Sequence, residues 1–578
     1  MANSIKKRGQ KILRKFSRAT IRASEEGKEH IKDNLIGRFS HIENIKLLIF
    51  EWVLLASALI MLAVTQAFWY GRSYAEDAFV SGGTYIEATV GEVKTMNPLF
   101  ATTSSEKVLS KLLFATLSTI DYSGHPNNGL ASSITPNEDG RVWTVKLKEG
   151  LTWSDGEPIT NQDVIFTANL IKNPLVNTIY NTNLANVKVS EDENGRIVFT
   201  LPTSYADFIS ALNFPVVPEH ILGEVDPKNL IENDFSSAPI TSGAFSFNAM
   251  QPIPNSHESI FYLSANPDYY GGSPLLNTFA IHTYDDKKSI IKAVNSGTVT
   301  ATAELSGNDI KEVSSEQFNQ KSSLLNSGAF IFFNTRNNSL SNTELRAAIR
   351  QGINLAKVRE SAPDTGEINY PLVDSQISLT NYPGIPGYDL EVAKTKIQEL
   401  LGDTPLHLDL ATVNTGYLPD VAESIAEELR GLGIEVEVSK YEEGKEFINE
   451  IISKRSYDIL VYEVELGADP DLLPYYHSSQ ASTIGLNLSN YRNALVDDLL
   501  LGARDTLDEE VRVKKYEKFL EYWVTDVPAI GVYRPNLTYF YNKNVRTFGN
   551  NVRLVTALDR FVDVSDWAVN KATKNKTP

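Results

Sequence analysis

Residues 406–462 read LHLDLATVNTGYLPDVAESIAEELRGLGIEVEVSKYEEGKEFINEIISKRSYDILVY, and this stretch decides the fold. Apolar and polar residues alternate in 406–412 and again in 434–438, a pattern that predicts strands. Between these two strands lies an apolar stripe at helical spacing, made of Val421, Ile425, Leu429 and Leu432. A second such stripe, around Phe447 and Ile451, precedes the apolar strand 457–462. This order of strands and helices predicts a parallel α/β sheet.

The segment that follows, EVELGADPDLLPYYHSS (463–479), contains four carboxylates within nine positions, Glu463, Glu465, Asp469 and Asp471. Ligands of open α/β sheets bind beyond the carboxyl ends of strands, and this segment lies at such an end. From the residues alone, four interpretations stay open: a metal site, an acid/base pair, a contact to a cationic ligand group, and a solvated loop.

Charge is distributed unevenly along the 578 residues. The first 74 residues carry a net charge of +7, so the remainder carries −25 of the total of −18. An acidic body repels nucleic acid, and we expect no nucleic-acid partner. There is no cysteine, which excludes disulfides, thiolate metal sites and a nucleophilic cysteine.

The N-terminal segment predicts a membrane anchor. Residues 47–70 contain one charged residue, Glu51, and are long enough to span a hydrocarbon core of roughly 20 residues. Twelve Lys or Arg precede the span, which places the N-terminus in the cytoplasm and the main body outside the plasma membrane. The alternative is a cleaved signal peptide ending near Ala75, but the apolar run and the basic region are both longer than such peptides have.

Other stretches of the body indicate β structure and give no catalytic motif. RVWTVKL (141–147) alternates, and 187–201 reads as a hairpin around Asn194-Gly195. No phosphate-binding loop or EF-hand loop is present, and the eight histidines have no spacing typical of metal ligands. We therefore expect neither a cofactor, nor a metal site, nor catalytic residues.

The most specific stretch is LTWSDGEPITNQDVIFT (151–167), which resembles the signature of the family 5 extracellular solute-binding proteins of peptide and nickel ABC importers. The residues that stand in the family pattern are Trp153, Asp155, Gly156, Pro158, Thr160, Asp163 and Val164. Further segments match in the same order over most of residues 82–548. The resemblance implies an α/β, periplasmic-binding-protein-like fold (class II), with two lobes around a cleft and an inserted third domain.

This resemblance also implies boundaries for each part of the chain. The expected parts are a basic cytoplasmic tail (1–46), a transmembrane anchor (47–70), a linker (71–81), lobe I (82–103, 205–317 and 536–568), an inserted domain II (104–204), lobe III (318–535) and a disordered tail (569–578).

In peptide-binding members of the family, an aspartate after a Gly-Trp pair binds the α-amine of the peptide, and Asp469 stands in its place. Glu465 and Leu466 occupy the Gly-Trp positions, which removes an aromatic wall, adds a charge and indicates a more cationic ligand. The residues expected to bind ligand are Asp469, Glu465, Leu466, Gly467, Ala468, Tyr475, Tyr85 and Asn97. For Tyr475, Tyr476 and His477 the alternative is packing and loop capping.

The expected function is that of a monomeric, membrane-anchored receptor that delivers oligopeptides to the permease subunits of an ABC importer. Another small solute, such as a metal chelate, haem or an oligosaccharide, is the alternative ligand. A surface sensor without transport and a surface peptidase are the alternative functions; the peptidase would need a catalytic constellation that the sequence does not show.

Overall fold

The computed structural model describes residues 46–176, 178, 180, 184, 186–442 and 444–575. Contacts divide the chain into a terminal unit, made of Met1–Ala78 and Ala572–Pro578, and a body, Phe79–Lys571. The basic tail expected at 1–46 lies outside the described residues, apart from Lys46.

Within its described residues, the terminal unit contains a long helix, α3 (Lys46–Tyr74). Its window Ile49–Gln66 has a mean hydropathy of 1.8 and buries none of its length, so by length and composition it could cross a membrane. Strands β1 (Ala75–Val80) and β21 (Asn570–Asn575) pair with each other where a linker and a disordered tail were expected. Each strand provides hydrogen-bond partners for the backbone of the other. Composition alone does not predict such pairing between the two ends of the body.

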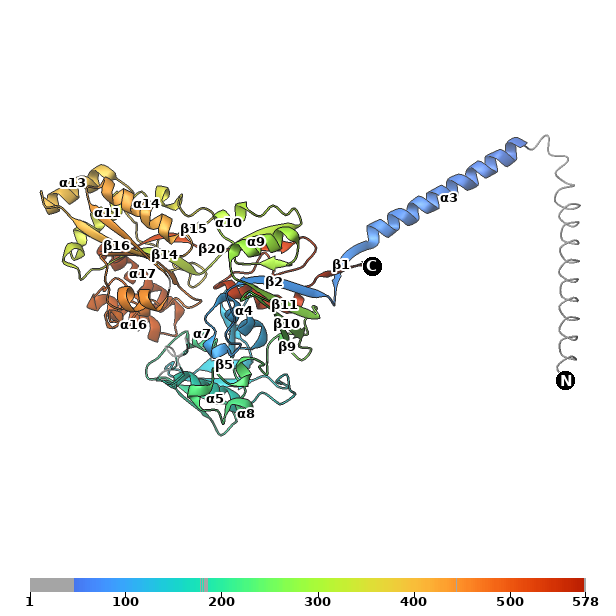
Figure 1. Cartoon of the computed structure of the whole chain (residues 1–578), viewed down its shortest axis with the longest axis horizontal. Coiled ribbons are helices and arrows are strands. Elements are labelled where there is room, and N and C mark those ends of the chain that lie inside the picture. The colour runs from blue at the N-terminus through green and yellow to red at the C-terminus, as the bar shows by residue number, and fades with distance from the viewer. Residues whose placement is uncertain are drawn as a thin grey trace, which may run out of the picture. The chain divides into compact units, whose positions relative to one another are not determined.

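Lobe I is built on a seven-stranded sheet in the order β13-β20-β12-β2-β11-β10-β9 (Figure 1). The strands are β13 (Phe318–Leu324), β20 (Asn536–Asn542), β12 (Ala301–Thr302), β2 (Thr84–Val90), β11 (Thr278–Tyr284), β10 (Ser259–Ala265) and β9 (Phe245–Pro252). The other elements are α4 (Ser104–Leu113), α9 (Lys287–Ser296), α10 (Asn308–Lys311) and the short helices η3 (Pro98–Phe100), η4 (Pro227–Asn229), η5 (Asp234–Ser236) and η9 (Ala557–Asp566). Helix α4 packs on this sheet, although it was expected in domain II.

Domain II, drawn in blue-green in Figure 1, packs into the same hydrophobic core as lobe I. Its strands are β3 (Ser118–Ile120), β4 (Pro126–Asn128), β5 (Ala131–Pro136), β6 (Val142–Leu147), β7 (Lys188–Glu191) and β8 (Ile197–Thr200), and its helices are α5 (Asn161–Lys172), α7 (Phe208–Ala211) and α8 (Glu219–Leu222). Residues from 205 onward were expected in lobe I, but α7 contacts β3 and β4 and α8 contacts α5, so domain II continues past residue 204. The alternation predicted for 141–147 and the hairpin predicted for 187–201 are confirmed. Thr160 and Asp163 form a capping box at the start of α5, so the signature segment has a structural role.

Lobe III has a six-stranded sheet in the order β15-β19-β14-β18-β16-β17. The strands are β15 (Gly366–Glu367), β19 (Ala529–Arg534), β14 (Ser327–Phe333), β18 (Ile459–Glu465), β16 (His407–Val413) and β17 (Glu435–Tyr441). Its helices are η6 (Asn338–Leu340), α11 (Thr343–Gly352), α12 (Leu355–Arg359), α13 (Leu390–Leu401), α14 (Leu418–Gly431), the π-helix η7 (Phe447–Ile452), α15 (Leu473–Tyr476), η8 (Ser478–Gln480), α16 (Ala494–Asp505) and α17 (Glu509–Asp526).

The parallel arrangement predicted for residues 406–462 is confirmed, because β16 pairs in parallel with both β17 and β18. The predicted stripe of α14 is buried, and Val421, Ile425 and Leu429 are fully inaccessible. On its other side β18 pairs antiparallel with β14, so the complete sheet is mixed.

Two short connections join the sheets of lobe I and lobe III. One leads from β13 to β14 through Leu325 and Asn326, and the other leads from β19 to β20 through Pro535. They lie side by side, since Leu325 N donates to Pro535 O over 3.0 Å. The boundary expected before Phe318 therefore moves to Leu325–Asn326, because β13 pairs with β20 of lobe I. Rotation of one lobe against the other would be concentrated at these two connections, which we call the hinge.

Candidate functional site

Strand β18 leads into the acidic segment and is longer than predicted. Glu463 and Glu465 are still in the strand, where they face Ala329 and Ser327 of β14. Alternation puts the two glutamates on one face; Glu463 is half-buried and Glu465 is exposed. The loop that carries the other two acids therefore begins at Leu466.

Two amide side chains from elsewhere in the body hold this loop. Gln376 Nε2 donates to Leu466 O over 2.7 Å and to Asp469 O over 2.8 Å. Asn326 Nδ2, from the hinge, donates to Gly467 O over 3.1 Å. Gly467 has a φ of +71°, the left-handed conformation that favours glycine. The loop is thus fixed to the hinge.

The two aspartates of the loop cap successive turns. Asp469 Oδ1 accepts from Asp471 N over 3.0 Å, and Asp471 Oδ1 accepts from Leu473 N over 3.1 Å, at the start of α15. This leaves one oxygen of each carboxylate free of the turns. Asp471 Oδ2 lies 3.4 Å from Arg504 Nε of α16.

The remaining oxygen of Asp469 meets domain II. The Tyr205 hydroxyl donates to Asp469 Oδ2, and the Arg504 guanidinium lies 4.3 Å from the centre of the Tyr205 ring. Ser204 Oγ and Ala206 N each donate over 2.8 Å to the end of α16, to Asp505 O and Arg504 O. Domain II and lobe III therefore touch directly at Asp469.

A third carboxylate, Asp207, follows on the same segment of domain II. Its Oδ2 lies 3.2 Å from Arg512 Nη1 of α17. The site thus gathers three carboxylates and two guanidinium groups, which leaves one negative charge in excess when all are ionised. We call Tyr205, Asp207, Asp469, Asp471, Arg504 and Arg512 the interlobe cluster.

Burial and mutual repulsion set the protonation of this cluster. Burial, followed by the charges of Asp207 and Asp471, raises the pKa of Asp469 well above its ordinary value. Burial also raises the pKa of Asp471, although Arg504 opposes this. Burial and the charges of Asp469 and Asp471 raise the pKa of Tyr205. The unliganded cluster therefore favours a bound proton, and a cationic ligand group could take its place.

Leu466, Ala468 and Tyr475, which were also predicted to bind ligand, make packing contacts and a hydrogen bond. Leu466 is 7% exposed and belongs to the lobe III core, while Ala468 packs against Ile120 of domain II and Val555. The Tyr475 hydroxyl donates to Glu465 O over 2.5 Å, and burial raises the pKa of Tyr475 to about 12. Tyr475 thus braces the loop, which agrees with the alternative of packing and capping.

Tyr85 and Asn97 lie apart from the cluster. Tyr85 is completely buried in lobe I, where its hydroxyl lies 2.7 Å from that of Tyr539. Asn97 is also fully buried, and its Oδ1 caps η3 by accepting from Leu99 N. The contacts of both are structural, and their expected role in ligand binding stays a prediction.

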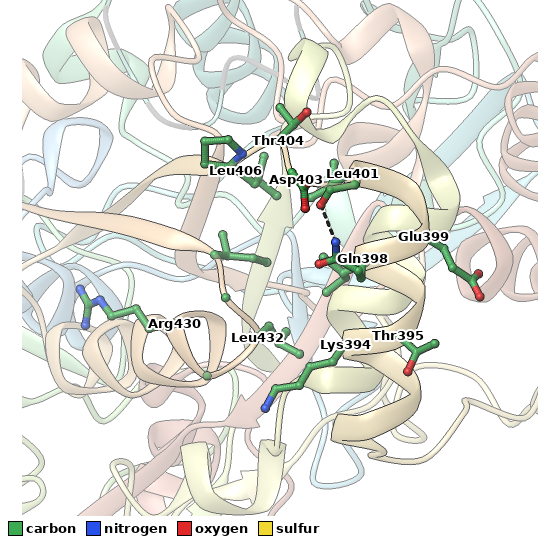
Figure 2. Close-up of a pocket in the computed structure, with 16 residues that line it drawn as sticks. Lys394, Thr395, Gln398, Glu399, Leu401, Asp403, Thr404, Leu406, Arg430 and Leu432 are labelled. Carbon is green, nitrogen blue, oxygen red and sulfur yellow. Dashed lines mark hydrogen bonds between the residues drawn. The ribbon is translucent and has the colours of Figure 1, made fainter.

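Two cavities bear on where a ligand could lie. One of about 580 Å³ is lined from lobe I by Lys287, Gly307 and Asp309 and from lobe III by Glu360 and Tyr417, so it marks the cleft between the lobes. A larger hollow of about 950 Å³ belongs to lobe III alone (Figure 2). There Lys394 of α13 and Arg430 of α14 lie on opposite sides, and no member of the interlobe cluster lines it.

Among the described residues, no group of three or more His, Asp or Glu is arranged to hold a metal ion. Sequence reasoning predicted the Asp469 loop as a ligand site, which stays a prediction, and it did not point to the residues that surround the loop: Tyr205, Asp207, Arg504, Arg512, Asn326 and Gln376. These residues carry no periodic signal and come from positions far apart in the chain, so only the fold brings them together.

A family model described as bacterial extracellular solute-binding proteins, family 5, matches residues 125–485. The oligopeptide-binding protein AppA of Bacillus subtilis is 27% identical over 485 residues, covering 79% of this chain and 87% of that protein. Its structure with a nonapeptide has a TM-score of 0.69 at 23% identity and covers 85% of this chain and all of that one.

Two further solved structures share the fold. The ABC transporter substrate-binding protein CtaP of Listeria monocytogenes has a TM-score of 0.74 at 23% identity, covering 85% of this chain and 100% of that one. NikZ of Campylobacter jejuni, solved with Ni(L-His), has a TM-score of 0.69 at 22% identity. The match covers 84% of this chain and 99% of NikZ. The α/β architecture with two lobes is thus confirmed by these structures, of which AppA holds a nonapeptide and NikZ holds Ni(L-His).

Proposed function

This chain belongs to the bacterial extracellular solute-binding proteins of family 5, and from that membership we propose that it captures oligopeptides for an ABC importer. Peptide enters the cleft between lobe I and lobe III, the lobes close over it, and the closed protein delivers it to permease subunits. AppA, whose structure holds a nonapeptide, is a relative that supports the choice of peptide.

The observation that carries the proposal is the position of Asp469. Its carboxylate lies where domain II and lobe III meet, on a loop that Asn326 ties to the hinge. The α-ammonium of a peptide would balance the excess negative charge of the interlobe cluster. Charge-assisted hydrogen bonds of this kind are roughly twice as strong as neutral ones, and partial burial strengthens them.

The paired connections at Leu325–Asn326 and Pro535 give the means of closure. Two short segments between rigid sheets concentrate rotation at a few residues. Because Asn326 also contacts the ligand loop, binding at Asp469 and closing of the lobes would be coupled.

We further propose that α3 anchors the protein. Its apolar window would cross the plasma membrane once, with the N-terminus in the cytoplasm and the body outside. Because the chain has no cysteine, single-cysteine variants test this cleanly. An impermeant maleimide added to intact cells should label S123C, in an exposed turn of the body, and should leave S4C unlabelled. Labelling of both would contradict a single crossing in this orientation.

Mass spectrometry of the ligand that copurifies with the full-length chain in nanodiscs tests the proposal. We expect peptides of several sequences with free amino ends, released on denaturation. A homogeneous non-peptide solute, such as a metal chelate, haem or an oligosaccharide, would overturn the choice of peptide.

Incubation of the protein with peptides distinguishes a receptor from a peptidase. Peptides kept with the protein should be recovered intact, and cleavage products would contradict the proposal. Association with a permease after crosslinking separates transport from a sensory role, and a monomer is expected in light scattering.

A further inference from the structure

Arg534, the last residue of β19, reaches from one connection of the hinge to the other. Its Nε donates to Leu325 O over 2.6 Å, and its Nη2 donates to Asn326 Oδ1 over 2.8 Å. One guanidinium group therefore binds two successive residues of the opposite connection. Hydrogen bonds from a charged donor are stronger than neutral ones, and the planar guanidinium binds two acceptors in fixed directions.

Asn326 joins this contact to both lobes. The residue is 2% exposed. Its backbone N donates to Val555 O of lobe I over 3.0 Å, and its backbone O accepts from Leu466 N of lobe III over 2.7 Å. Its side-chain Nδ2 donates to Gly467 O in the Asp469 loop. Asn326 therefore lies between lobe I and the loop, and Arg534 binds the remaining polar atom of its side chain.

A second arginine makes the same kind of contact entirely within lobe III. Arg359 Nε donates to Val532 O of β19 over 2.6 Å, and Arg359 Nη2 donates to Asn369 Oδ1 over 3.2 Å. Its Nη1 also lies 3.1 Å from Glu367 Oε1. Both arginines are half-buried. Arg359 thus holds parts of one lobe together, whereas Arg534 joins the two connections on which movement between the lobes depends.

The bonds of Arg534 depend on the angle of the hinge. Rotation at the hinge changes the backbone torsion angles of its three residues, so the acceptors on one connection move relative to the arginine on the other. Both bonds are formed in the arrangement described here, in which Tyr205 of domain II donates to Asp469 of lobe III. We call this the closed arrangement, since rotation of the lobes away from each other would separate Tyr205 from Asp469.

We propose that Arg534 is a positioning residue that stabilises the closed arrangement and thereby lowers the ligand concentration at which the lobes close. The proposal rests on the proposed function, in which the lobes close over a ligand. Arg534 acts through the hinge and through Asn326, which holds the Asp469 loop. The apparent Kd of a ligand depends on how readily the binding-competent arrangement forms, so a less stable closed arrangement raises the apparent Kd in proportion.

The test measures closure of the full-length chain in nanodiscs by single-molecule energy transfer between two dyes. Because the chain has no cysteine, the dyes can be attached at E193C in domain II and D403C in lobe III, both at exposed positions. The probe is a pool of random peptides of three to nine residues. The dyes of wild type should approach each other as peptide is added. R534M should need about tenfold more peptide to close half of the molecules, which corresponds to about 1.4 kcal/mol.

R359M is the matched control, because it removes an equivalent contact from within lobe III. It should lower the melting temperature and yet close at the same peptide concentration as wild type. An equal shift in the closing concentration of R359M and R534M would overturn the inference, since the effect would then be one of general stability.

A second variant covers the case that R534M does not fold. R534K keeps the positive charge but lacks the planar group that binds two acceptors, so it should need about threefold more peptide than wild type. Closure of R534K at the concentration of wild type would also overturn the inference.

The inference and the proposed function fail in different ways. If no peptide of the pool brings the dyes together in wild type, the proposed closure over peptide is wrong and the inference falls with it. If wild type closes on peptide and R534M closes at the same concentration, the proposed function stands and the role of Arg534 is refuted.

Discussion

Two buried groups of charged residues in the body differ in their charge balance and in where they lie. In lobe I, Arg560 Nη2 donates to Glu87 Oε1 over 2.6 Å, and Tyr539 donates to Glu87 Oε2 over 2.8 Å. Glu87 and Arg560 are 0% and 2% exposed. Glu87 and Arg560 form a close ion pair, and Tyr539 binds the second oxygen of the carboxylate.

The interlobe cluster differs in both balance and location. It has one carboxylate in excess, its ion pairs are longer, at 3.2 and 3.4 Å, and it lies between parts of the body that the hinge can move. A balanced pair within one lobe serves stability, whereas an unbalanced cluster between lobes is poised to accept a cation. The comparison predicts that substitutions in the two groups have different consequences.

The largest effect is expected at the balanced pair. Arg560→Met should lower the free energy of unfolding by about 3–5 kcal/mol, because it leaves Glu87 buried without its counter-charge. Urea denaturation of the unliganded protein measures this. Arg546→Met is the control: its 3.7 Å pair with Asp566 is largely exposed, and its loss should cost less than about 1 kcal/mol. If both variants lost a similar free energy of unfolding, the buried pair would be no more important for stability than the exposed one.

The next effect is on binding. Asp469→Asn should weaken peptides with a free amino end by about 2–5 kcal/mol, since a partly buried ammonium loses its charge partner. N-acetylated forms of the same peptides should bind the variant and wild type alike. Calorimetry with both peptide forms makes the measurement, and an unchanged preference for the free amino end would exclude Asp469 from the site.

The two groups should also differ in how pH affects stability. Asp469 has a raised pKa when folded and one of about 3.9 when unfolded, so the folded state holds the extra proton between these values. Its contribution to stability is therefore present at low pH and is lost as pH rises through the folded pKa. The amide side chain of the D469N variant has no such proton, so the stability of D469N relative to wild type should increase as pH rises from 4 to 7.

Thermal denaturation across that pH range, without peptide, checks the pH effect. Asp192→Asn, at the surface of domain II, supplies the comparison. If the difference in melting temperature between D469N and wild type were the same at every pH, the pKa of Asp469 would not be raised in the folded protein.

The smallest effect is expected at Glu465. Its side chain is exposed at the end of β18, where solvent screens its charge. Glu465→Gln should weaken a peptide with lysine beside the amino end by no more than about twofold and should leave an alanine peptide unchanged. A loss as large as that of D469N would mean that Glu465 lies inside the closed site and contacts the ligand.

The sequence predicts the part of this comparison that depends on local pattern. Alternation and helical stripes over 406–462 predict the parallel strands of lobe III and place the Asp469 loop at a strand end. The extension of β18 to Glu465 is not predicted, because acidic residues break the apolar run while β14 still supplies backbone partners.

The partners of Asp469 could not be predicted for a different reason. Tyr205 lies 264 positions before Asp469, and its contact depends on how domain II docks against lobe III. Tyr85 shows the converse: an aromatic near the expected cleft turns inward, because its hydroxyl finds Tyr539 within the lobe I core. Tertiary packing determines both contacts, and neither contact produces a periodic pattern in the sequence.

A structure of the full-length chain with a bound peptide tests the central claim most directly. The account predicts that the amino nitrogen of the peptide lies within about 3.2 Å of an Asp469 carboxylate oxygen, between lobe III and domain II. A peptide bound with its carboxylate toward the cluster would contradict the account, as would one bound in the hollow beside Lys394 and Arg430.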